Sequence, residues 1–127
     1  MKRIRDLLRC DNGATIIELA FGLTAFLMMT FGIIDIARVL WTLGSLHYAA
    51  ESAARCASVN TTTCGSATAI QTYALDKYYG ESLGSSNPFT YSATGCGNTV
   101  TASYNYSLTI PLAGSYTIPL NATACFP

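Results

Sequence analysis

Residues 14–34, ATIIELAFGLTAFLMMTFGII, form the apolar run that decides the fold of this chain. A helix of these 21 residues is about 31 Å long, which matches the hydrocarbon core of a bilayer at about 30 Å. The run therefore predicts one membrane-spanning helix. It contains a single acid, Glu18, which costs roughly 2.5–3.5 kcal/mol at mid-bilayer on insertion scales, so Glu18 is a candidate functional residue.

The charge distribution around this run predicts its orientation. Of the 127 residues, 50% are hydrophobic and only 11% are charged, which is typical of one small domain joined to a segment that lies in lipid. Four of the cations, Lys2, Arg3, Arg5 and Arg9, precede the run. Short segments rich in Lys and Arg stay in the cytoplasm, so we expect a single-pass membrane protein with a cytoplasmic N-terminus and an exported C-terminal part. The basic segment indicates orientation and not a nucleic-acid site.

The apolar run continues into DIARVLWTLGSLHYAAESAARCAS, residues 35–58, which has the pattern of an amphipathic helix. Apolar residues recur there at steps of three and four: Ile36, Val39, Leu40, Leu43, Leu46, Ala50, Ala53, Ala54 and Ala57. No proline occurs from residue 14 to residue 58, so we expect one continuous helix. A cleaved secretory signal peptide is a weaker alternative, because its apolar region is only about 7–15 residues long.

Three side chains of this continuation have more than one interpretation. Trp41 and Tyr48 lie roughly opposite the apolar stripe, where they either anchor the helix at the membrane interface or contact a neighbouring subunit. His47 falls on the apolar face with no second ligand at metal-binding spacing, so we expect it to be packed in the core and to bind no metal.

The residues beyond 58 predict a small α+β head. A short helix is expected in SATAIQTYALDKYYG, with Ser66 as its N-cap and Gly80 as its stop. Alternating apolar and polar residues predict three strands, at residues 89–95, 99–110 and 115–125, which form an antiparallel sheet. We expect PLAGS, residues 111–115, to form the turn before the last strand, and Pro119 to place that strand at an edge of the sheet. One face of the sheet should pack on the alanine-rich end of the long helix.

Four of the five cysteines lie in the exported part, namely Cys56, Cys64, Cys96 and Cys125. An even number of cysteines in an oxidising compartment, on a head this small, predicts disulfides. Three pairings are possible, and proximity in the sequence favours Cys56 with Cys64 and Cys96 with Cys125. Zinc is the competing interpretation, but the chain has no CxxC spacing.

No catalytic motif is present in the sequence. It contains no GxSxG, no HExxH and no glycine-rich phosphate loop, and its single histidine leaves no catalytic triad. We therefore expect a protein that is not an enzyme and that needs no cofactor or metal.

The order of these features resembles the processing site of type IV pilins and pseudopilins: a basic start, Gly13, the small residue Ala14, and Glu18 as the fifth residue after the glycine. Three segments resemble the TadE-like family of the tight-adherence (Flp, type IVb) pilus system, namely GATIIELAFGL, FGIIDIARVLW and HYAAESAARCAS. The resemblance covers the first 58 residues. The chain departs from the family at Thr24, where a proline is frequent, and at Leu19, where an aromatic residue is frequent.

The resemblance implies a minor pilin or pseudopilin that contributes to pilus assembly and cell adhesion. Residues 1–13 would be a leader, 14–34 the transmembrane helix, 35–58 its amphipathic continuation and 59–127 the head. The implied partners are a prepilin peptidase, other pilin subunits, the assembly platform of the inner membrane and inner-membrane lipid. The alternative is an uncleaved signal-anchor protein that displays a small disulfide-bonded periplasmic domain.

The resemblance also implies roles for individual residues. The peptidase would cleave between Gly13 and Ala14, and the new amine of Ala14 would pair with Glu18 of a neighbouring subunit. Two such charges attract strongly in a medium of low dielectric constant, but only when both are present and close. This charge pair would select the register in which subunits assemble.

Overall fold

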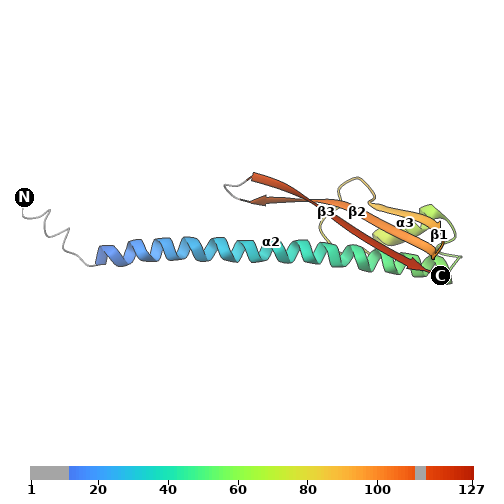
Figure 1. Cartoon of the computed structure of the whole chain (residues 1–127), viewed down its shortest axis with the longest axis horizontal. Coiled ribbons are helices and arrows are strands. Elements are labelled where there is room, and N and C mark those ends of the chain that lie inside the picture. Colours follow the sequence, from blue (N-terminus) through green and yellow to red (C-terminus); the bar gives the residue numbers. More distant parts are fainter. Residues whose placement is uncertain (1–11, 111–113) are drawn as a thin grey trace, which may run out of the picture. The chain divides into compact units, whose positions relative to one another are not determined.

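The computed structural model describes residues 12–110 and 114–127, with side chains from residue 15 onward. Its elements follow in the order α2 (Asn12–Val59), α3 (Ala67–Asp76), β1 (Phe89–Thr94), β2 (Gly97–Ile110) and β3 (Gly114–Phe126) (Figure 1). The α+β fold predicted from the sequence is confirmed, with its long apolar helix, short helix, three-stranded antiparallel sheet and two disulfides.

Helix α2 runs for 48 residues without a break. Two threonines in its apolar part make hydrogen bonds within the helix: Thr24 Oγ1 donates to the Ala20 carbonyl and Thr30 Oγ1 to the Phe26 carbonyl, each at 2.8 Å. These bonds to the residue four positions earlier satisfy both hydroxyls without water. The polar side chains are therefore compatible with a helix that lies in an apolar environment.

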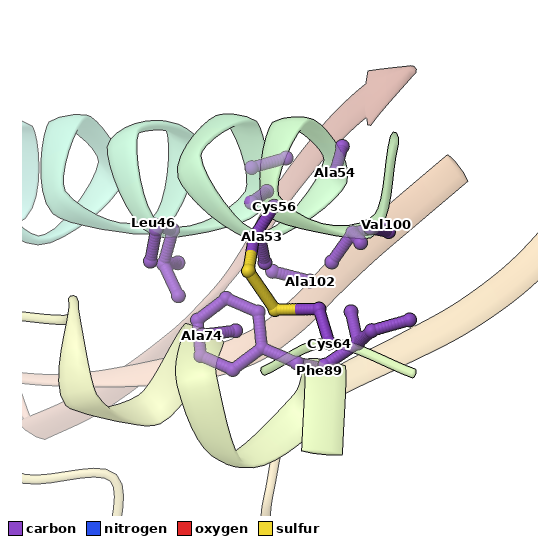
Figure 2. Close-up of a cluster of buried hydrophobic side chains, with 14 of the residues drawn as sticks. Leu46, Ala53, Ala54, Cys56, Cys64, Ala74, Phe89, Val100 and Ala102 are labelled. Carbon is purple, nitrogen blue, oxygen red and sulfur yellow. A yellow bond between two sulfur atoms is a disulfide. The ribbon is translucent and has the colours of Figure 1, made fainter. Parts of the chain in front are cut away.

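Residues Ala37–Pro127 form one compact unit, here called the C-terminal unit. Its core lies between the alanine-rich end of α2, helix α3 and one face of the sheet (Figure 2). The buried residues of α2 are mostly alanine, and the largest fully buried side chains of the unit include Phe89, Leu46 and Val100. Small side chains on the helix leave room for the large ones of the strands. The predicted packing of the sheet on the alanine-rich end of the helix is confirmed.

Helix α3 begins where the sequence predicts and ends earlier. The Ser66 side chain caps its first turn by accepting a hydrogen bond from a backbone N–H at 3.2 Å. The helix ends at Asp76, four residues before Gly80, so the prediction of Gly80 as the stop was wrong. The cause is a tertiary contact, because the Tyr79 N–H donates to Ser45 Oγ of α2 at 2.6 Å and cannot continue the helix.

The three strands pair in the order β1-β2-β3, and both pairs are antiparallel. Strand β1 covers only the first part of β2, from Gly97 to Ala102, whereas β3 pairs along nearly all of it. Strand β3 is an edge strand, as Pro119 predicted. Most of the predicted turn at residues 111–115 lies outside the described residues.

Two disulfides close the C-terminal unit. Cys56 of α2 bonds to Cys64, with 5.9 Å between their Cα atoms, and Cys96 bonds to Cys125 of β3, with 6.3 Å. This is the pairing that proximity in the sequence favoured. Bridges of this kind stabilise a small domain by about 2–4 kcal/mol each, mainly by restricting the unfolded chain.

The end of α2 also holds the ends of two strands. Ser58 Oγ lies 3.3 Å from the carbonyl oxygen of Phe126, to which it donates, and accepts from Asn98 Nδ2 at 3.1 Å. Gly97 has φ +125°, and a Cβ at this position would collide with the backbone of Phe126. Glycine is therefore required where β2 begins beside the last residues of β3.

Candidate functional site

Glu18 lies near the start of α2, one helical turn after Ala14. Residues four positions apart share a helix face, and helical side chains lean toward the N-terminus, so the Glu18 carboxylate leans toward the backbone of Ala14. Glu18 is exposed, and among the described residues it forms no ion pair. Gly13 and Ala14 also belong to α2, and the structure describes their backbone only. The N-terminal part of α2 thus presents an exposed acid that has no ion-pair partner within the described part of the chain.

An exposed apolar surface surrounds this acid. The large side chains of this stretch, such as Phe21, Phe26, Met29 and Ile33, are all exposed. By length and composition, α2 can cross a membrane, and its most apolar window of 18 residues has a mean hydropathy of 1.9 with none of it buried. A continuous apolar surface of this size needs lipid or other apolar helices around it. Helix α2 therefore fits a membrane anchor.

A second exposed apolar surface lies on the C-terminal unit. It is a groove of about 280 Å³, here called the aromatic groove, and its lining residues are Leu40, Trp41, Gly44, Ser45, Tyr48 and Tyr79. Trp41, Tyr48 and Tyr79 are 68%, 53% and 61% exposed. A Cβ at Gly44 would meet no other atom within 4 Å, so the floor of the groove is open at this residue.

Hydrogen bonds fix the walls of the aromatic groove. Trp41 Nε1 donates to the Tyr79 carbonyl at 3.1 Å, while the Tyr79 N–H donates to Ser45 Oγ at 2.6 Å. The rings of Tyr48 and Tyr79 are 6.2 Å apart between centroids, at an interplanar angle of 35°. The structure therefore brings together Trp41 and Tyr48, which sequence reasoning selected, with Tyr79, which it did not. The signal for Tyr79 was its position in an aromatic pair directly after a helix.

The residue before Tyr79 stabilises the same segment. Tyr78 is half-buried, its ring meets that of Phe89 edge-on at 6.4 Å between centroids, and its hydroxyl donates to the Glu81 carbonyl at 2.8 Å. The pKa of Tyr78 is raised to about 12, mainly because its side chain is partly buried and to a smaller extent because Tyr104 is nearby. The phenol consequently remains a neutral hydrogen-bond donor through the physiological range.

His47 is exposed, so the prediction that it packs in the core was wrong. The buried face of α2 passes through Leu46 and Ala50, and successive residues of a helix are rotated by about 100°, which turns His47 out of the core. Ile36 and Leu40, at the start of the predicted apolar stripe, are exposed as well. The part of the chain that the structure describes holds no group of three or more His, Cys, Asp or Glu side chains that could bind a metal ion.

Comparison with curated proteins and with solved structures finds no match to this chain. The model of one family, described as TadE-like protein, matches residues 13–55, about a third of the chain. The matched residues begin at Gly13 and include Glu18, the exposed apolar part of α2 and the part of the aromatic groove that belongs to α2. The resemblance found in the sequence is confirmed over residues 13–55, which are similar to the TadE-like family.

Proposed function

We propose that the chain is a minor pilin or pseudopilin of a tight-adherence (Flp, type IVb) pilus, and that it contributes to pilus assembly and adhesion. The observation that carries this proposal is the TadE-like match over residues 13–55, which indicates a pilus-related protein. The folded C-terminal unit supports a minor role, because a helix alone would suffice for packing in a filament shaft. Its partners are a prepilin peptidase, other pilin subunits and the assembly platform of the inner membrane.

Glu18 has a specific part in this proposal. Cleavage between Gly13 and Ala14 creates an amine four residues from an exposed carboxylate on an apolar helix. In an apolar environment an unpaired charge is unfavourable, whereas two opposite charges in contact attract each other strongly. The Ala14 amine of one subunit and Glu18 of its neighbour therefore select the one register between the two helices in which these groups meet. Before assembly, the N-terminus lies in the cytoplasm and the C-terminal unit in the periplasm.

The mature N-terminus tests this proposal. We expect the protein purified from membranes of its own host to begin at Ala14, as measured by intact mass and N-terminal sequencing. The Gly13→Val variant should keep residues 1–13, because a branched side chain replaces the glycine before the cleaved bond. Gly22→Val is the matched control: a Cβ at Gly22 meets no atom within 4 Å, so this variant should still be processed. A native protein that begins at Met1 would support the uncleaved signal anchor instead.

We further propose that the aromatic groove contacts a neighbouring subunit and not lipid. Arg38 cannot lie deep in the hydrocarbon core, and Tyr48 follows it by ten residues, about 15 Å along the helix. The headgroup layer is only about 5–7 Å thick on each side of the hydrocarbon core. Tyr48 therefore lies beyond the lipid, whereas its exposure and aromatic character are typical of protein interfaces.

Variants of the groove distinguish the two interpretations. We expect Tyr48→Ala to reduce the amount of the chain in sheared filaments about tenfold, relative to the amount in membranes, since an aromatic anchor at an interface contributes about 1–2 kcal/mol or more. The matched control is Tyr116→Ala, because Tyr116 is also 53% exposed but lies on β3 outside the groove. Equal incorporation of both variants would contradict the subunit contact.

A further inference from the structure

The outer face of the sheet, opposite the core, carries uncharged polar side chains. They alternate along β2 and β3 with residues that face the core, and the exposed ones include Ser103, Asn105, Ser107, Thr117, Asn121 and Thr123. The register places them in rows across the two strands, with Ser103 opposite Asn121 and Ser107 opposite Thr117. We call this surface the outer sheet face.

The outer sheet face is unusual because it has no charge. No Asp, Glu, Lys, Arg or His occurs after Glu81, although charged residues make up about a quarter of an average protein and more of its surface. Edge strands in particular are commonly protected by lysine, yet the edge strand β3 has none. Nucleic acids and anionic lipids are bound largely through Lys and Arg, so neither is complementary to this face.

The amide side chains of Asn105 and Asn121 lie near the ring of Pro119 on the outer sheet face. Pro119 is exposed and lies directly opposite Asn105, while Asn121 is two residues further along β3. Such diagonal neighbours are about 7–8 Å apart. Within the described residues neither amide side chain makes a hydrogen bond, and each offers two donors and one acceptor. By contrast, Thr90 Oγ1 donates to the Thr101 carbonyl at 3.3 Å elsewhere on the same face.

The composition of this face argues against a second copy of the chain as its occupant. Protein interfaces are enriched in Tyr, Trp, Phe, Met and Arg and depleted in serine, and their energetic centres rarely contain Ser or Thr. The tyrosines of β2 and β3 alternate onto the opposite face of the sheet, at positions such as Tyr104 and Tyr106. Three exposed aromatic residues of the C-terminal unit, Trp41, Tyr48 and Tyr79, gather in the aromatic groove instead.

We propose that the outer sheet face binds a neutral carbohydrate, an uncharged glycan rich in hydroxyl groups. A pyranose ring presents C–H groups on its flat face, which would pack on Pro119. The hydroxyls at its edge would exchange hydrogen bonds with Asn105, Asn121 and the flanking serines. Neighbouring strands are about 4.8 Å apart, which is close to the size of one sugar ring, so successive rings can contact successive strands. This binding would depend on the sheet alone, and neutral glycans would be the class of surface to which the subunit adheres.

A panel of immobilised glycans tests the proposal with the full chain in detergent micelles. The panel contains neutral polymers (β-glucan, mannan and chitin oligosaccharides) and acidic ones (alginate, heparin and polysialic acid). We expect binding to neutral glycans only, and no change in affinity between about 0.01 M and 1 M salt because no charges are involved. The assay uses the isolated chain, so its result does not depend on cleavage or on filament assembly.

Substitutions locate the binding site on the outer sheet face. Asn105→Ala/Asn121→Ala should weaken binding to the retained neutral glycan at least tenfold. Gln71→Ala, which removes an amide from α3, should bind normally, and formation of both disulfides, measured by mass, should show that each variant is folded. Four results would overturn the proposal. The chain could bind no glycan, it could bind the acidic glycans, or Asn105→Ala/Asn121→Ala and Gln71→Ala could bind equally well. The fourth is that the chain forms an oligomer that dissociates when Asn105 and Asn121 are substituted.

Discussion

Glu18→Ala is expected to leave export and cleavage intact and to remove the protein from filaments. In the proposed assembly, the variant would keep the new Ala14 amine of the neighbouring subunit but deprive that amine of its partner in an apolar environment. Removing one member of a buried ion pair costs about 3–5 kcal/mol, which corresponds to a loss of more than about a hundredfold in incorporation. The measurement is the ratio of the chain in sheared filaments to the chain in membranes, with the intact mass reporting the Ala14 start.

The control for this experiment is another exposed glutamate of the same helix. Glu51→Ala removes an acid from the second half of α2, where no cleaved N-terminus is proposed, and should incorporate normally. Glu18→Asp should retain part of the incorporation, because it keeps the charge on a shorter side chain. Normal filaments from Glu18→Ala would remove the charge pair from the mechanism and leave the proposed cleavage untouched.

Phe89→Ala is expected to destabilise the C-terminal unit by about 3–5 kcal/mol, as found for phenylalanine truncation in well-packed cores. Phe89 is 1% exposed and lies at the start of β1, and Figure 2 shows it on the strand side of the core with α2 on the other. The truncation would leave a cavity beside the ring of Tyr78, whose centroid lies 6.4 Å from that of Phe89. Denaturant unfolding of the full chain in detergent, followed by the fluorescence of the single tryptophan, Trp41, measures the loss.

Tyr116→Ala provides the comparison for the core substitution. It removes an aromatic ring from β3 that is half exposed, so the free energy of unfolding should change by less than about 0.5 kcal/mol. A loss below about 1 kcal/mol for Phe89→Ala would show that the core tolerates truncation, and that the disulfides Cys56–Cys64 and Cys96–Cys125 provide most of the stability.

The elements with a regular sequence pattern were predictable. Helix α2 follows from an apolar run of membrane-spanning length without proline, and β2 follows from the alternation of Val100, Ala102, Tyr104 and Tyr106 with polar residues. When one face of a helix or strand is buried, apolar residues recur at the spacing of that element, so the spacing predicts whether a segment is a helix or a strand. The disulfide pairing was the simplest of three, because closing a short loop needs little chain ordering.

The features that depend on contacts distant in the sequence were not predictable. Helix α3 ends at Asp76 because Tyr79 bonds to Ser45, a residue 34 positions earlier, and the same bond places Tyr79 in the aromatic groove. The exposure of His47 depends on which face of α2 the strands cover, and the apolar pattern alone was too broad to define it. Cleavage after Gly13 and the role of Glu18 were inferred from a family resemblance and stay predictions.

The charge-free sheet also affects how the protein responds to acid and alkali. A side chain makes stability depend on pH only when the folded and unfolded chains bind different numbers of protons. From Ser82 to Phe126 the chain has no Asp, Glu, Lys, Arg or His, and its two cysteines are bonded to each other. Tyr78, with its pKa raised to about 12, favours the folded state below pH 10 and loses that contribution only as the pH rises toward 12. The sheet therefore has no carboxylate, amine, guanidinium or imidazole side chain whose protonation would make its stability depend on pH.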